Sequence, residues 1–175
     1  MKTMDILRRF LLPAPIVSLI GYARFGCKIS PRAEVELTPN LRIGRGTQIS
    51  SFVKIKASGG ELVIGERVAI ATGVFISAHG GGIEIGDDSM VGPNVAIVGV
   101  NYRYDRLDVP VQWQGQTSKG ITIGRDVWLG ANVVVLDGAS IGDHTIVSPG
   151  SMVSGRLPDR VIAGGSPAKV VFKRR

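Results

Sequence analysis

Cysteine, histidine and aromatic residues are scarce in this 175-residue sequence, and each shortage excludes a class of protein. Cys27 is the single cysteine, so no disulfide can form within the chain and nothing demands an oxidising compartment. The two histidines, His79 and His144, are too few for a three-histidine zinc centre, and we expect no metal. Aromatic residues make up only 6%, so nucleic-acid binding would depend on net charge alone, and we expect no nucleic-acid partner.

Long apolar runs and nucleotide-binding fingerprints are also missing. No stretch reaches the roughly 20 apolar residues that a membrane-spanning helix requires. No glycine-rich fingerprint follows a strand and opens a helix, so nothing predicts a kinase or a dehydrogenase. The net charge of +7 has two interpretations, which are simple solubility and attraction of anionic ligands such as coenzyme phosphates, nucleotide-sugars or lipid head groups.

Glycine and aliphatic residues are abundant, and they follow a period of six. Residues two apart on a strand face the same way, so each anchor and the residue two positions before it can point inward together. The glycine after an anchor, at positions 124, 130 and 142, is expected to supply the backbone freedom of a tight corner. The anchors of the second half are Ile123, Leu129, Val135, Ile141, Val147 and Val153.

The same period runs through the first half with three-residue insertions near 59–60 and at 80–82. It begins irregularly around Ile29 and Val35. The spacing predicts a single domain in which the chain turns three times per coil and buries the anchors in columns. Its register places His79 under Val100. The regular anchors are Ile43, Ile49, Ile55, Ile64, Ile70, Ile76, Ile85, Val91 and Ile97.

Two segments, residues 123–132 (IGRDVWLGAN) and 161–170 (VIAGGSPAKV), resemble the hexapeptide-repeat acyltransferases, similar to the maltose, galactoside, xenobiotic and polysaccharide O-acetyltransferases. The resemblance covers the chain from about residue 29 onward. It implies an all-β fold, a left-handed parallel β-helix, and a homotrimer. The left hand comes from the resemblance, since parallel crossovers are generally right-handed.

We therefore divide the chain into an N-terminal helical cap segment (1–28), the repeat (29–158) and a C-terminal tail (159–175). Apolar residues at helical spacing predict a short amphipathic helix over 4–12, which Pro13 and Pro15 end. This helix covers the open first coil, contacts a membrane surface, or belongs to a signal peptide. We expect a cytoplasmic protein, with peripheral contact at the inner face of the membrane as the second interpretation.

The repeat fails between Ile97 and Ile121, which predicts a protruding functional loop over 101–120. In the resembling family this loop reaches the active site between subunits, and a histidine after an asparagine at its start is the catalytic base. Here Asn101 is followed by Tyr102, and a free tyrosine, with a pKa near 10, is a poor base at neutral pH.

The two histidines have separate interpretations. His79, at the corner where the loop departs, replaces the missing base or caps a glycine-rich corner. His144 stacks on Asp126, three residues after successive anchors, which favours a hydrogen-bonded surface pair.

The resemblance implies that Trp128, Ala131 and Lys169 line the site of acetyl-coenzyme A, the expected cosubstrate. Pro149 replaces the alanine of the family's Gly-Ala-Gly-Ser pattern and removes a backbone donor. The loop carboxylates of Asp105 and Asp108 bind acceptor hydroxyls or are simply solvated.

These residues predict an acyl-coenzyme A-dependent O-acyltransferase that acetylates a sugar hydroxyl in polysaccharide or glycoconjugate biosynthesis, with a small-molecule or glycan acceptor. The alternative is a non-catalytic β-helix binding or assembly protein that has lost the family's catalytic histidine. Zinc-dependent carbonic anhydrases of the same fold need three histidines, a cluster that His79 and His144, at different corners, could not readily rebuild.

Overall fold

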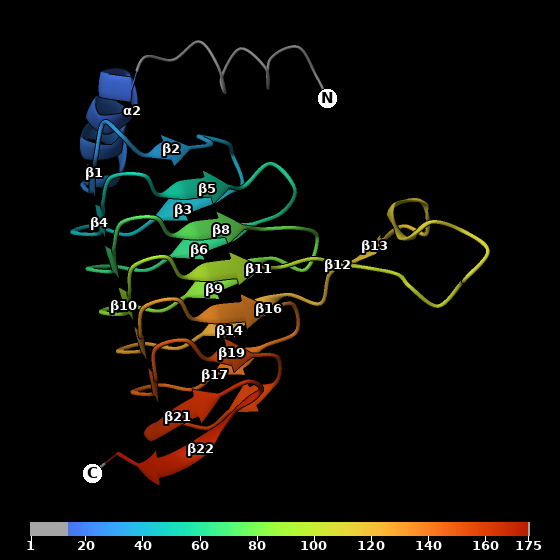
Figure 1. Ribbon diagram of the computed structural model, residues 1–175. Coiled ribbons are helices and arrows are strands. Elements are labelled where there is room, and N and C mark those ends of the chain that lie inside the picture. Colours follow the sequence, from blue (N-terminus) through green and yellow to red (C-terminus); the bar gives the residue numbers. More distant parts are fainter. Residues whose placement is uncertain (1–13, 175) are drawn as a thin grey trace.

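The structure, a computed structural model, describes residues 14–174, and the helix predicted over 4–12 lies outside them. Three parallel sheets form the faces of a column (Figure 1). The β1 sheet contains β1 (Lys28–Ile29), β4 (Gln48–Ile49), β7 (Ala69–Ile70), β10 (Met90–Val91), β15 (Trp128–Leu129), β18 (Ile146–Val147), β21 (Val161–Gly165) and the antiparallel β22 (Ala168–Lys173).

The other two faces have six strands each. The β2 sheet contains β2 (Glu34–Val35), β5 (Lys54–Lys56), β8 (Phe75–Ser77), β11 (Ala96–Val98), β16 (Val134–Leu136) and β19 (Met152–Val153). The β3 sheet contains β3 (Leu41–Ile43), β6 (Leu62–Ile64), β9 (Ile83–Ile85), β14 (Ile121–Ile123), β17 (Ser140–Ile141) and β20 (Arg156–Leu157).

Each coil gives one strand to each sheet, as the six-residue period predicted. Anchors pair with anchors of the next coil: Ile64 with Ile85, Ile70 with Val91, and Ile76 with Ile97. In Figure 1 the strands β5, β8 and β11 run from left to right at the front, and the chain returns behind them while descending toward its C-terminus. This path is left-handed, so the predicted left-handed parallel β-helix is confirmed.

The interior is a column of aliphatic side chains with a few hydroxyls between them. Ile76, Ile97 and Leu129 are fully buried. Thr47 and Thr145 occupy inward positions, and each donates a 2.8 Å hydrogen bond to a backbone carbonyl of the next coil. These hydroxyls therefore satisfy their bonding within the core, which removes the cost of burying them.

The glycines that follow the anchors do not have the role that the sequence suggested. A Cβ on Gly124, Gly130 or Gly142 would lie 2.5–2.8 Å from a backbone nitrogen of the next coil, which leaves no room for any side chain. The left-handed backbone lies two residues later, with φ values of 49° at Asp126 and 58° at His144. Close coil packing, not turning, requires these glycines, while Asp126 and His144 adopt the left-handed conformation at the corners.

Both ends of the column carry additional elements. At the N-terminal end α2 (Ala14–Ile20) continues into the π-helical turn η1 (Gly21–Phe25), which lies over the first coil. Pro15 is the second residue of α2, so this proline lies within a helix, where the sequence predicted only that it would end one. At the C-terminal end β21 extends the β1 sheet beyond the last predicted anchor, and β22 pairs with it antiparallel.

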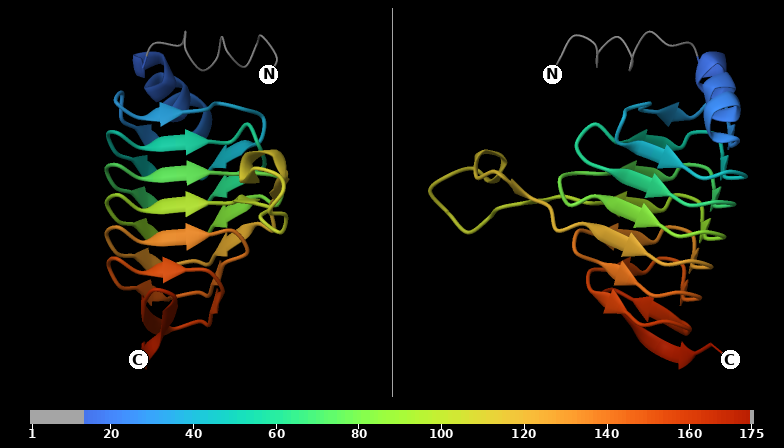
Figure 2. Two further views of the ribbon diagram at one scale, coloured as in Figure 1. Left: turned by 45° about the vertical axis from the view of Figure 1, so that its right-hand side comes forward. Right: turned by 180° about the vertical axis from the view of Figure 1, so that it is seen from behind.

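The loop over 101–120 leaves the column as a narrow stalk. Its base is a two-stranded antiparallel ribbon of β12 (Asn101–Tyr102) and β13 (Gln116–Thr117), and its far part contains a 3₁₀ turn, η2 (Val111–Trp113). Figure 2 shows the loop projecting to one side of the column. No helix within residues 14–174 is long and apolar enough to cross a membrane.

We expect Leu129→Ala to lower the free energy of unfolding by about 2–5 kcal/mol, because it leaves a cavity in the fully buried column. Met90→Ala on the adjacent strand is the control, since its side chain is 48% exposed. Urea denaturation of both variants measures the difference. Equal losses would mean that Leu129 does not belong to the tightly packed interior.

Candidate functional site

The loop leaves and rejoins the column at the corner between the β2 and β3 sheets, which we call the loop corner (residues 77–82, 99–101 and 117–120). Ser118 fastens its parts together, since its hydroxyl donates to the Gly99 carbonyl at 2.6 Å and accepts from the Gly81 amide at 2.9 Å. Val98 pairs with Ser77. This register leaves His79 one coil before Val100, at the position that the sequence predicted.

His79 is half-buried at this corner. Its Nε2 atom lies 3.4 Å from the Ser77 hydroxyl, which is itself buried. A Cβ on Gly59 of the preceding coil would lie 3.1 Å from Nδ1, and a Cβ on Gly60 would overlap the backbone of His79. The glycine insertion at 59–60 therefore makes room for His79, whose ring is oriented by a hydroxyl at one nitrogen.

Asp137 fixes the returning end of the loop. Its carboxylate is buried and accepts hydrogen bonds from the Lys119 amide at 2.8 Å and the Gly120 amide at 2.9 Å. Neither Asp137 nor Ser118 was predicted from the sequence. The signal available for Asp137 was its position on the inner, normally aliphatic side of the repeat, two residues after the Val135 anchor.

Asn101 and Tyr102 lie at the base of the stalk with exposed side chains, and Tyr102 is 47% exposed. Of the two loop carboxylates, Asp108 is held by Arg106 at 2.6 Å, and this hydrogen bond lowers the pKa of the Asp108 carboxyl below its usual range. Asp105 is exposed and has no hydrogen bond or salt bridge in the described part of the chain. The loop projects away from the column (Figure 2), so one chain does not bring these two carboxylates to its own His79.

A groove of about 400 Å³ opens beside the loop corner on the outer face of the β3 sheet. Gly81 and Lys119 form the wall at the corner, and Glu61, Glu84 and Thr122 are among the other residues that line it. Its walls combine carboxylates, a hydroxyl and an ammonium group with exposed backbone. Such a lining is suited to a ligand with several hydroxyl groups.

Trp128, Ala131 and Pro149 gather at a different corner, between the β1 and β2 sheets. Trp128 is 47% exposed on β15 and borders a hollow of about 300 Å³ together with Met90. Lys169 is exposed on β22, where it pairs with Gly164 one coil beyond Pro149. We call this group the tryptophan corner.

Pro149 removes no hydrogen bond between coils at the tryptophan corner. The coils are joined there by amides on either side of the proline position, from Ser148 to Ala163 at 2.8 Å and from Gly150 to Ala131 at 2.9 Å. The proline position therefore needs no donor for packing. A ligand at this corner receives no hydrogen bond from it.

The two corners stand at opposite edges of the β2 sheet. Asp137, which binds the loop corner, comes six residues after Ala131 of the tryptophan corner, and six residues of extended chain span about 20 Å. One chain therefore does not bring the tryptophan corner to His79. No group of three or more metal-ligating side chains occurs within residues 14–174.

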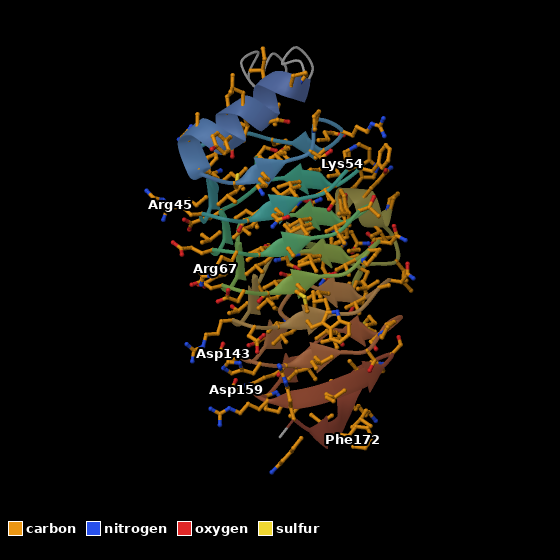
Figure 3. The ribbon with its side chains drawn as sticks, turned by 90° about the vertical axis from the view of Figure 1, so that its left-hand side faces the viewer. Arg45, Lys54, Arg67, Asp143, Asp159 and Phe172 are labelled. Carbon is orange, nitrogen blue, oxygen red and sulfur yellow. The ribbon has the colours of Figure 1, made fainter. Side chains whose placement is uncertain are left out.

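His144 and Asp126 form the predicted surface pair, with 2.9 Å between Nδ1 and the carboxylate. Arg174 also donates to Asp126, at 3.2 Å. The hydrogen bond from His144 and the charge of Arg174 lower the pKa of the Asp126 carboxyl. The pair lies at the third corner, between the β3 and β1 sheets, where Figure 3 shows Asp143 and Asp159 stacked on successive coils.

Residues 120–155 match the family model described as bacterial transferase hexapeptide (six repeats). A Mycobacterium tuberculosis protein named "Probable acetyltransferase" is 34% identical over 169 residues, which are 97% of this chain and 56% of that protein. The galactoside O-acetyltransferase of Escherichia coli is 43% identical over 51 residues, 29% of this chain and 25% of the enzyme. The chain thus spans little more than half of the first relative.

Solved structures with the same fold include a single-residue variant of AntD, an N-acyltransferase of Bacillus cereus, in complex with dTDP-4-amino-4,6-dideoxyglucose and coenzyme A. The TM-score is 0.78 at 21% identity, covering 92% of this chain and 89% of AntD. The polySia-specific acetyltransferase NeuO gives a TM-score of 0.65 at 27% identity, covering 75% and 60%. The resemblance to hexapeptide-repeat acyltransferases is confirmed.

We expect Asp137→Asn to destabilise the protein by about 1–3 kcal/mol, because the amide nitrogen of asparagine would replace the Oδ2 oxygen that accepts from the Lys119 amide at 2.9 Å, and two donors would then face each other. Hydrogen exchange at Lys119 and Gly120 should accelerate in this variant. Asp108→Asn, on the exposed loop, is the control and should change stability by less than about 0.5 kcal/mol. Unchanged exchange at both amides would contradict the assignment.

The lowered pKa of Asp126 predicts a pH dependence of stability. A carboxyl whose pKa is lower in the folded state stabilises the fold above its unfolded pKa of about 3.9, and this contribution disappears as the pH falls through the folded value. Wild type should therefore melt above Asp126→Asn near neutral pH, and the gap should close in acid. Asp105→Asn is the control. A gap that is constant with pH would contradict the pairing.

Proposed function

The chain contains the bacterial transferase hexapeptide repeat and resembles acetyltransferases of that family in sequence and fold, and on this basis we propose that it is an acyl-coenzyme A-dependent O-acyltransferase. Acetyl-coenzyme A is its cosubstrate, and the acceptor is a sugar hydroxyl in polysaccharide or glycoconjugate synthesis. The observation that carries the proposal is the matched segment 120–155, which includes Trp128, Ala131 and Pro149. The E. coli relative named a galactoside O-acetyltransferase favours a sugar acceptor.

The separation of the two corners supports a complete site between copies of the chain. In a closed ring of three copies, the loop corner of one copy meets the tryptophan corner of the next. The groove beside Gly81 then faces the hollow beside Trp128, and Asp105 on the projecting loop approaches the neighbouring copy. A homotrimer is part of the proposed function for this reason.

Acyl transfer in this arrangement needs a base and a donor for the carbonyl oxygen. The acceptor hydroxyl oxygen attacks the thioester carbonyl carbon while a ring nitrogen of His79 takes the hydroxyl proton. The Asn101 amide donates to the carbonyl oxygen as negative charge develops on it. Coenzyme A leaves as its thiolate and receives the proton from the imidazolium, which restores neutral His79.

Release of free coenzyme A from acetyl-coenzyme A, with a panel of sugars and nucleotide-sugars, tests the assignment. We expect His79→Ala to lower kcat by about 10² to 10⁴ and Tyr102→Phe to change it little, because His79 supplies the base. His144→Ala is the control, since His144 belongs to the third corner. Equal turnover of wild type and His79→Ala would remove His79 from the mechanism.

Gly80→Ala tests the same corner independently. A Cβ on Gly80 meets nothing within 4 Å and the residue is not in the left-handed region, so the fold tolerates alanine there. An acceptor that approaches His79 would meet the new methyl group, and we expect a higher KM for the acceptor. Gly155→Ala, equally open at the same corner three coils later, should leave KM unchanged.

The competing function is a non-catalytic scaffold, which is favoured by Tyr102 at the position where the family carries its base. Coenzyme A binding measured by calorimetry separates the two. Binding and turnover that both fail in wild type would favour the scaffold, whereas turnover lost in His79→Ala excludes it.

A further inference from the structure

The helical segment over the first coil, residues 14–25, is apolar on both of its sides. Val17 and Gly21 face the column, where a Cβ on Gly21 would lie 2.6 Å from the Ile29 side chain. Leu19 and Tyr22 face the other way, and they are 66% and 68% exposed. Exposed apolar side chains that gather on one side of an element mark an interaction site, so this outer side fits an apolar partner.

Basic residues lie near this apolar side, and of the two glutamates on the first coil, Glu34 pairs with Lys54 and Glu36 is buried. Residues 14–33 contain Arg24, Lys28 and Arg32 and no acidic residue. Arg45 joins them, since its side chain lies 3.4 Å from the Cβ position of Gly26, at the end of η1 (Figure 3). None of these four basic side chains has a salt bridge in the described part of the chain. We call Ile16, Leu19 and Tyr22 with Arg24, Lys28 and Arg45 the end surface.

The exposed apolar side chains and the basic residues together indicate which kind of partner fits the end surface. A second copy of the chain docked here would bring Arg24, Lys28 and Arg45 of both copies together, which like-charge repulsion opposes. A partner with an apolar interior beneath an anionic surface satisfies both features. Tyrosine also prefers the boundary between an apolar phase and water.

We propose that the end surface docks on the anionic surface of a phospholipid membrane. Leu19 and Tyr22 enter the boundary between head groups and acyl chains, and Arg24, Lys28 and Arg45 contact lipid phosphates. The helical segment lies at one end of the column (Figure 1), so the column stands on the membrane. His79 is two coils beyond the first, which places it about 10 Å further along the axis.

The proposed docking does not depend on enzymatic activity. What it implies for the acceptor rests on the proposed function. A loop corner only two coils beyond the first favours an acceptor sugar that is attached to a lipid over one that is free in solution. Vesicle binding tests the docking whether or not the chain is an acyltransferase.

Cosedimentation of the full chain with vesicles of phosphatidylcholine, with and without phosphatidylglycerol, tests the proposal. We expect wild type to bind the vesicles that contain phosphatidylglycerol, and Leu19→Ser/Tyr22→Ser to weaken partitioning about tenfold or more through lost apolar burial. Phe172→Ser is the matched control, because Phe172 is 64% exposed on β22 at the opposite end of the column (Figure 3). It should bind as wild type does.

A variant that lacks basic side chains tests the electrostatic part of the docking separately from the apolar part. Arg24→Gln/Arg45→Gln should bind several-fold more weakly at low salt and match wild type near 1 M salt, where the Debye length falls to about 3 Å. The proposal is overturned by absence of wild-type binding to phosphatidylglycerol vesicles, or by full binding of the Leu19→Ser/Tyr22→Ser variant. A change of oligomeric state in that variant, measured by light scattering, would also overturn it and assign the surface to a second copy.

Discussion

Successive coils of this protein lie one strand spacing apart, about 4.8 Å, and the rest of the structure depends on that contact. The backbone of each coil bonds to the next, so a side chain that separates two coils breaks bonds on both. Gly124, Gly130 and Gly142 have no Cβ because the next coil occupies its place. Thr47 and Thr145 are accepted inside because each hydroxyl finds a carbonyl of the adjacent coil. Insertions are therefore accommodated at the corners, between one strand and the next.

The functional features follow from this restriction. An insertion can leave the column only at a corner, and the loop over 101–120 does so between the β2 and β3 sheets. Its two ends must then be rejoined to neighbouring coils, which Ser118 and Asp137 achieve with hydrogen bonds to backbone groups. The same corner holds His79 against Ser77. Hydrogen bonds to neighbouring coils therefore fix both ends of the projecting loop.

A column of parallel coils also has two open ends, and the chain treats them differently. At the C-terminal end β22 pairs antiparallel with β21 and extends the β1 sheet, while β19 and β20 are the last strands of the other two sheets. At the N-terminal end a helical segment covers the first coil with Val17 and Gly21, but it leaves Leu19 and Tyr22 in solvent. The C-terminal end thus adds one strand to one sheet, whereas the helical segment at the N-terminal end presents an apolar surface with basic residues nearby.

The sequence by itself determined the repeat, its three anchors per coil, the position of the loop, the place of His79 under Val100 and the pairing of His144 with Asp126, because each follows from counting residues in a fixed register. It did not determine why Gly124 is glycine or that Asp137 and Ser118 hold the loop. Those depend on groups from different coils that meet only when the column has formed. The tertiary structure alone decided which side chains line the groove beside Lys119 and the hollow beside Trp128, since those side chains come from different coils and meet only in the folded column.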